Sequence, residues 1–132
     1  MISSGLEEFL KHLRDVESMF HANSMTEVEA VSETQDLLHY LELCEQDDET
    51  MKSVCRRLKE IRKERRAAKD YILQAGHVVS WIEANRQVIK SLEQVLGQVR
   101  KEERRGESRV FSPRTNTIDN LMKGEGNDSD QA

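Results

Sequence analysis

Residues 51–82, MKSVCRRLKEIRKERRAAKDYILQAGHVVSWI, decide the fold that this sequence predicts. Their apolar side chains recur at alternating intervals of three and four residues, which places them on one face of an α-helix. The repeat is typical of a coiled-coil helix, and Arg65 is its single polar member. The series is Met51, Val54, Leu58, Ile61, Arg65, Ala68, Ile72, Ala75, Val79 and Ile82. We therefore expect a long helix that starts near Asp48 and buries this apolar seam.

The same helix carries eight cations between positions 56 and 69. Most of them fall on two neighbouring rows of the helix surface, opposite the seam, with Glu60 and Glu64 interspersed. The residues that we predict to bind a partner, called the basic stripe below, are Arg56, Lys59, Arg62, Lys63 and Arg66. Three interpretations stay open at this stage: a face that is solvated or paired internally, a docking face for an acidic protein, and a surface that follows nucleic-acid phosphates.

Charge is divided unevenly along the chain. Residues 1–50 have a net charge of −11, residues 51–105 a net charge of +8, and the last 27 residues a net charge of −2, which together give the total of −5. The acidic and basic parts must either face each other or face different partners. Nucleic-acid binding is the less favoured interpretation, because the chain is acidic overall and no aromatic residue lies among the cations for base stacking.

Shorter patterns predict the helices around this segment. Apolar residues between 6 and 20 predict one helix, with Leu6, Phe9, Leu13, Val16 and Phe20 on its buried stripe. Ser24 and Glu27 read as a capping box that starts a second helix, which ends near Cys44 and buries Val28, Val31, Leu38 and Leu41. Asp47 or Asp48 is expected to cap the long helix.

A shift of the apolar stripe predicts that the long helix breaks at residues 83–86, with Asn85 capping the next helix. In that next helix the expected seam is Val88, Leu92, Val95 and Val99. Trp81 is offset from the main seam, and we expect the register shift to bring it into the core. An exposed partner anchor is the alternative.

Composition changes after Arg105, where glycine, serine, asparagine and aspartate become frequent. We therefore divide the chain into a helical domain, 1–105, and a mobile tail, 106–132. Residues 110–122 form a short candidate docking segment, with Phe111, Pro113 and Arg114 as the predicted partner-binding residues and a helical turn beginning at Thr117.

Motifs of catalysis and of cofactor binding are missing from the sequence. It has no nucleophile elbow and no phosphate-binding glycine loop, and its histidines have neither metal-ligand spacing nor a cysteine at such spacing. We predict no catalytic residue, no cofactor and no metal. Cys44 and Cys55 are expected to be free, buried thiols. Neither a secretory signal nor an apolar run of membrane-spanning length is present, so the expected location is the cytoplasm, without membrane contact.

Two segments, Leu58–Asp70 and Arg109–Arg114, together resemble small helical accessory proteins encoded by phages and prophages of Gram-positive bacteria. The resemblance covers roughly residues 40–114 and carries over no catalytic residue. It implies a small cytoplasmic protein that acts by binding in an infected or lysogenic cell.

These observations together predict an all-α protein, with an antiparallel helical hairpin or small bundle and a flexible C-terminal tail. The expected function is non-enzymatic binding and regulation of a host or phage protein through the basic stripe. The alternative is nucleic-acid binding through the same residues, in phage replication or transcription control. Homo-oligomerisation through the seam of residues 51–82 is compatible with either function.

Overall fold

The protein is all-α, as the sequence predicts. The computed structural model describes the backbone of residues 1–130 and the side chains of residues 1–124. It contains four helices within that range: α1 (Ile2–Leu43), α2 (Asp48–Ala84), α3 (Arg86–Glu107) and α4 (Thr117–Asp130). The chain forms two compact units, Met1–Val99 and Arg100–Ala132.

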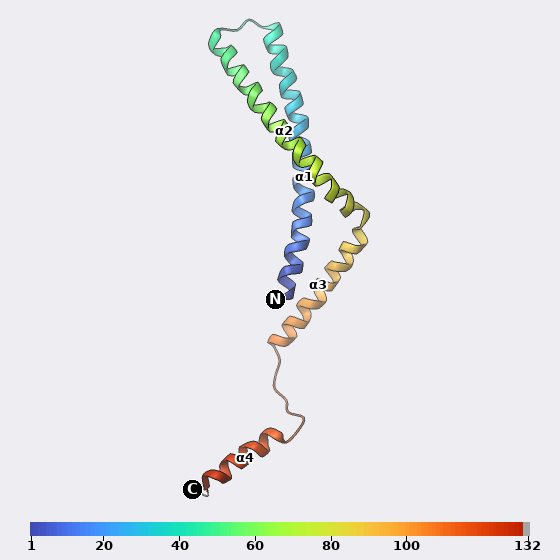
Figure 1. Cartoon of the computed structure of the whole chain (residues 1–132), viewed down its shortest axis with the longest axis vertical. Helices are drawn as coiled ribbons and strands as arrows, with labels where there is room; N and C mark the ends of the chain where they lie inside the picture. The colour runs from blue at the N-terminus through green and yellow to red at the C-terminus, as the bar shows by residue number, and fades with distance from the viewer. Residues whose placement is uncertain (131–132) are drawn as a thin grey trace. The chain divides into compact units, whose positions relative to one another are not determined.

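In the first unit, α1 and α2 pack against each other as an antiparallel pair (Figure 1). The connection between them is only four residues long, from Cys44 to Asp47. Asp47 is the N-cap of α2, as predicted: its carboxylate accepts a hydrogen bond of 2.7 Å from the backbone N–H of Thr50. The pKa of Asp47 is lowered by this hydrogen bond, because it favours the charged carboxylate.

The predicted seam of α2 is confirmed for most of its length. Its buried members are Val54, Ile61, Ala68, Ala75, Val79 and Ile82. Ile61, with no exposed surface, and Ile82, with 2% exposed, are the most deeply buried large side chains among the described residues. Met51 is an exception at 46% exposed, because it lies in the first turn of α2 beside the connection.

One continuous helix replaces the two that we predicted before residue 44, so the capping-box prediction at Ser24 is wrong. The Ser24 hydroxyl donates instead to the carbonyl of Phe20, at 2.9 Å, inside the helix. Asn23, Thr26 and Thr34 bond the carbonyl four residues earlier in the same way. Such local bonds satisfy polar side chains without ending a helix.

The buried face of α1 is rotated slightly from the predicted one, since Leu13 is buried as expected and Leu6, Val16 and Phe20 are partly buried. Leu10 is 2% exposed and Ala30 4%, whereas Phe9, Val28 and Leu38 are about half exposed or more. The rotation was hidden because polar residues occupy the helical positions that continue the buried row. Those partly or fully buried polar residues include Ser3, Glu17, Ser24, Glu27 and Thr34.

The break between α2 and α3 lies at Asn85, within the predicted range. Asn85 directly precedes α3, and its carbonyl accepts the N–H of Ile89 at 3.0 Å. Its side-chain amide, however, donates to the carbonyl of Trp81 at 2.8 Å, so the side chain bonds the preceding helix and does not cap the next one. Trp81 itself is 44% exposed, and its assignment to the core is wrong. Val79 and Ile82 occupy the buried face of this last part of α2, and Trp81 lies on another face of the helix.

The start of α3 is tied to α1 by an ion pair between Arg86 and Glu17, with 2.9 Å between Nη2 and Oε1. The hydrogen bond and the charge of Glu17 raise the pKa of Arg86. Leu96 is the buried residue of α3, whereas Val88 and Val95 of the predicted seam are exposed. Leu92 and Val99 of the predicted seam are partly buried, and with Ile89 and Leu96 they form the row that faces inward, so the prediction is right for two of its four residues and one position early at the two exposed valines.

The second unit contains the end of α3 and the helix α4. The Asn116 carbonyl accepts the N–H of Asn120 at 2.9 Å, which closes the first turn of α4 where the sequence predicted a single turn at Thr117. Ile118, Leu121 and Met122 are all exposed. The mobility of residues 106–132 stays a prediction.

Because Ile61 is fully buried, truncating it should destabilise the fold. We expect Ile61→Ala to lower the free energy of unfolding by about 2–5 kcal/mol, through lost burial and the cavity left behind. Urea unfolding followed by circular dichroism measures the change. The control is Leu73→Ala, since Leu73 is 62% exposed on the same helix and its truncation should cost less than about 0.5 kcal/mol. Equal losses for the two variants would contradict the described packing.

Gly76 offers a test with the opposite sign. It lies inside α2, and a Cβ built there would be 3.8 Å from Cε2 of Phe20, an ordinary van der Waals distance. Gly76→Ala should therefore stabilise the protein by about 0.5–1 kcal/mol through its helix propensity. The matched control is Gly97→Ala in α3, where no atom lies within 4 Å of the new Cβ. Destabilisation by Gly76→Ala alone would mean that α1 lies closer to α2 than described.

Candidate binding surface

The two flanks of the α1–α2 seam differ in charge. On one flank, Arg57 makes a bidentate ion pair with Glu33 of α1, with Nε–Oε1 at 2.8 Å and Nη2–Oε2 at 2.9 Å. The Nη1 atom of Arg57 also lies 3.5 Å from Glu60 and 3.3 Å from Glu64. Positive charge on this flank is therefore neutralised by carboxylates from both helices.

The ion pair shifts the pKa of both of its members, Glu33 and Arg57. The hydrogen bond from Arg57 lowers the pKa of Glu33, and the charge of Arg57 acts in the same direction. Conversely, the hydrogen bond to Glu33, with the charges of Glu33 and Glu64, raises the pKa of Arg57. The two paired side chains are 39% and 43% exposed, so salt should weaken their attraction appreciably.

The other flank is cationic. Arg57 and Arg62 are five residues apart, which separates them by about 140° around a helix and places them on opposite sides of the seam. Glu60 and Glu64 are engaged by Arg57, although the sequence places them among the basic residues. Their carboxylates therefore pair with Arg57 and not with a residue of the basic stripe.

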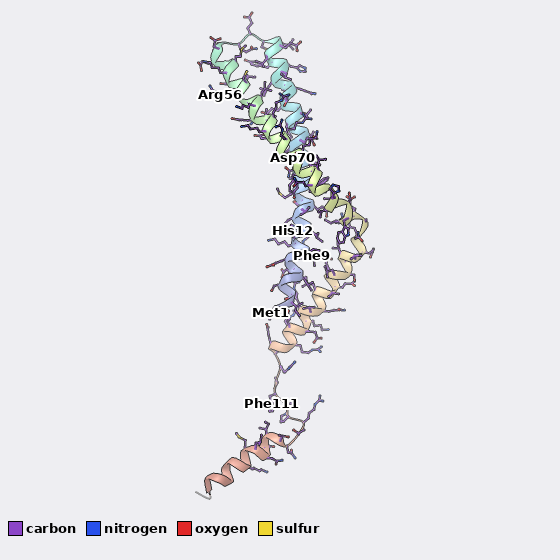
Figure 2. The ribbon with its side chains drawn as sticks, in the orientation of Figure 1. Met1, Phe9, His12, Arg56, Asp70 and Phe111 are labelled. Carbon is purple, nitrogen blue, oxygen red and sulfur yellow. The ribbon has the colours of Figure 1, made fainter. Side chains whose placement is uncertain are left out.

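All five residues of the basic stripe are exposed, and none has an ion pair with another residue in the part of the chain that the structure describes. Figure 2 shows Arg56 on α2 near the turn that joins the two helices. Asp70, where α2 crosses α1 in the same view, is an exposed acid at the far end of the stripe. The internal-pairing interpretation thus applies to Arg57 and does not apply to the basic stripe.

Three shallow depressions line the cationic flank. One, of about 340 Å³, is lined by Arg62, Arg65, Arg66 and Lys69. A second, of about 210 Å³, shares Arg62 and Arg65 with the first and reaches α1 at Val31, Thr34 and Gln35. The third, of about 310 Å³, shares Val31 with the second and adds Glu27, Val28 and Ser32. Of the three, the second is lined by both helices and forms a short groove between them, whereas the first lies on α2 and the third on α1.

Arg65 occupies a seam position but is exposed, and it has no ion pair among the described residues. Arg65 lines both the groove between the helices and the depression on α2. An arginine on an apolar seam can extend its charged end outward past its apolar stem, and the exposure of Arg65 agrees with that arrangement. Arg65 adds a cation to the groove that the predicted set of site residues did not include.

Phe111, Pro113 and Arg114 lie in the connection between α3 and α4, within the second unit, and all three are exposed. The structure thus leaves both predicted binding elements accessible, each in its own unit.

Cys44 and Cys55 are free, as expected, but both are exposed, so the prediction that they are buried is wrong. Cys44 lies at the end of α1 and Cys55 on the outer side of α2.

No group of three or more metal-ligating side chains occurs among the described residues. Over the same residues, none of the helices combines the length and the apolar character that crossing a membrane requires. Comparisons with protein-family models, with curated proteins and with solved structures give no match. The surface of the first unit is therefore the basis for assigning a function.

Two features of the surface were missed from sequence. The pairing of Glu33 with Arg57 follows from the hairpin register, because a turn centred between residues 45 and 46 places residues whose numbers sum to about 91 opposite each other. The exposed apolar flank of α1, which includes Val28, was missed because the buried row of that helix contains polar residues.

The lowered pKa of Glu33 predicts a pH dependence of stability. A carboxyl whose pKa is lower in the folded than in the unfolded state stabilises the fold above its ordinary pKa of 4.5, and this contribution disappears as the pH falls through the lowered value. We expect Glu33→Gln to unfold at lower denaturant than the parent at pH 7, with the difference shrinking below pH 4.5. The control is Glu29→Gln, an exposed glutamate of α1 without an ion pair in the described region. A difference that persists unchanged at low pH would contradict the pairing.

Proposed function

We propose that this protein is a non-enzymatic binding protein that engages an acidic partner protein through the basic stripe of α2 and regulates it by stoichiometric association. The proposal rests on one observation: some cations of α2 are paired with carboxylates and others are not. Glu33 of α1 and two glutamates of α2, Glu60 and Glu64, all pair with Arg57. The five residues of the basic stripe, in contrast, are exposed and have no ion pair in the described region. Such unpaired cations on a regular helix attract negative charge from another molecule.

A protein partner is favoured over a nucleic acid by the surroundings of the stripe. The groove that Arg62 and Arg65 share with α1 also contains the apolar side chain of Val31, which can pack against a protein side chain but gains nothing from a phosphate. The lining residues include no aromatic side chain on which a base could stack.

The partner is proposed to be a host or phage protein of the cytoplasm, in keeping with the resemblance of residues 40–114 to phage accessory proteins. Phe111, Pro113 and Arg114 are proposed as a second contact, which an exposed and short connecting segment can provide. Homo-oligomerisation remains compatible with this function.

Nucleic-acid binding is the second candidate, favoured by the stripe itself. Its cations follow i, i+3 and i, i+4 spacing on a straight helix, and Glu60 and Glu64 do not neutralise them. In that case the affinity for DNA or RNA should fall steeply with salt.

A pull-down from host cells tests the proposed function. We expect one dominant acidic partner, and we expect replacement of all five stripe residues by glutamine to weaken its binding by about tenfold to a hundredfold. The matched control replaces five other exposed cations by glutamine, so that both variants carry the same net charge: Lys11, Arg14, Lys90, Lys101 and Lys123. Equal capture by both variants would show that the stripe is not the contact.

A mobility-shift assay at low salt tests the second candidate. Nucleic-acid binding through the stripe predicts a shift with duplex DNA or RNA that is lost in the five-glutamine variant and retained in the control. If the parent gives no shift at low salt, the nucleic-acid interpretation is discarded.

A further inference from the structure

The depression on α2 is lined by cations alone. Its volume is about 340 Å³, and its lining residues are Arg62, Arg65, Arg66 and Lys69, all of them exposed. Their spacing of i, i+3, i+4 and i+7 places the four side chains on one face of a single helix, within two turns or about 10 Å. The depression therefore concentrates four positive charges in a small space.

These four charges receive no counter-charge from the described part of the protein. None of the four residues has an ion pair with another described residue. Glu60 and Glu64 pair with Arg57 on the other flank, and Asp70 makes no ion pair with Arg66, one helical turn before it. Like charges three and four residues apart on a helix repel each other, so an anion bound between them relieves this repulsion.

The lining side chains indicate the chemistry of a ligand. Guanidinium groups form paired hydrogen bonds with phosphate oxygens, and Lys69 adds a compact charge. A terminal phosphate carries a charge of about −1.5 to −2 at neutral pH, and each further phosphate in a chain adds about one more negative charge. A triphosphate group thus carries about four charges, which matches the four cations, whereas a single phosphate neutralises about half of them.

We infer that this depression binds a triphosphate group, either as inorganic tripolyphosphate or as part of a nucleotide. Its volume lies near the lower end of the roughly 300–1,000 Å³ typical of small-molecule sites, which suits a short phosphate chain. The four lining side chains include none that is apolar or aromatic, so they offer no stacking surface to a base. Arg65 and Lys69 lie outside the basic stripe, so the site can be tested separately from the proposed function.

Calorimetric titration of the full chain with sodium tripolyphosphate tests the inference, at about 100 mM salt and without divalent cations. We expect a dissociation constant below about 1 mM, and at least about tenfold weaker binding of orthophosphate, because orthophosphate engages fewer of the four cations. Equal affinities for the two anions, or no binding of tripolyphosphate, would refute the triphosphate site.

ATP distinguishes the two sources of the triphosphate group. We expect its affinity to lie within about threefold of that of tripolyphosphate, because the lining side chains contact phosphates only. A larger difference in favour of ATP would overturn recognition of the triphosphate group alone, since the nucleoside would then contribute contacts that the depression does not offer.

Two double variants with the same net charge locate the site. Arg65→Gln with Lys69→Gln should weaken tripolyphosphate binding by at least about tenfold, because half of the cations of the depression are removed. The matched control is Arg56→Gln with Lys59→Gln, which removes two cations of α2 outside the depression and should weaken binding by less than about threefold. Circular dichroism and urea unfolding confirm that each variant folds. Equal losses would overturn the inference, since the anion would then respond to the overall charge of α2.

Failure of this inference remains distinguishable from failure of the proposed function. Arg65→Gln with Lys69→Gln leaves all five residues of the basic stripe in place, so the pull-down decides on the stripe whatever the titration gives. A single strand of five nucleotides spreads its four phosphates along its length and should bind at least about tenfold more weakly than tripolyphosphate. Tighter binding of this strand would refute the triphosphate site and favour nucleic-acid binding.

Discussion

Packing of the α2 seam against α1 is the constraint on which the other features of the first unit depend. The burial of Ile61, Ala68 and Ile82 fixes the rotation of α2 about its own axis. Because side chains on a helix have fixed angular positions, this rotation also fixes which cations point away from α1. Arg57 is directed to Glu33, and Arg62 is directed to the other flank. A different rotation would exchange these roles.

The pairing of Arg57 shapes the electrostatics of the whole hairpin. By engaging Glu33 of α1 together with Glu60 and Glu64 of α2, it holds these three carboxylates on one flank. The opposite flank then presents Arg62 and Arg65 beside the partly buried Val31. The exposed pair itself contributes little to stability, so its main effect is to leave the two flanks with different charge. A surface with this asymmetry discriminates between partners better than a uniformly basic one.

The success of the sequence-based predictions differed between the two helices of the hairpin. The α2 seam is apolar except at Arg65, so the buried row, the Asp47 cap and the break near Asn85 could be read directly. In α1, Glu17, Ser24, Glu27 and Thr34 occupy positions on the buried side, and the row of apolar residues lies partly beside the buried row. The hydroxyl at Ser24 was read as a cap, although it is satisfied by the carbonyl of Phe20 within the helix.

By itself, the sequence determined the helical class, the boundaries of α2 and the candidate residues of the basic stripe, because these follow from local spacing, capping and charge. Tertiary structure decided which of the cations are neutralised, that Trp81 and Val28 stay exposed, and that Arg65 joins Arg62 along a groove. These outcomes depend on how two helices far apart in sequence are rotated against each other. That rotation is set by the sum of many packing contacts, and a single helix does not encode it in its own pattern.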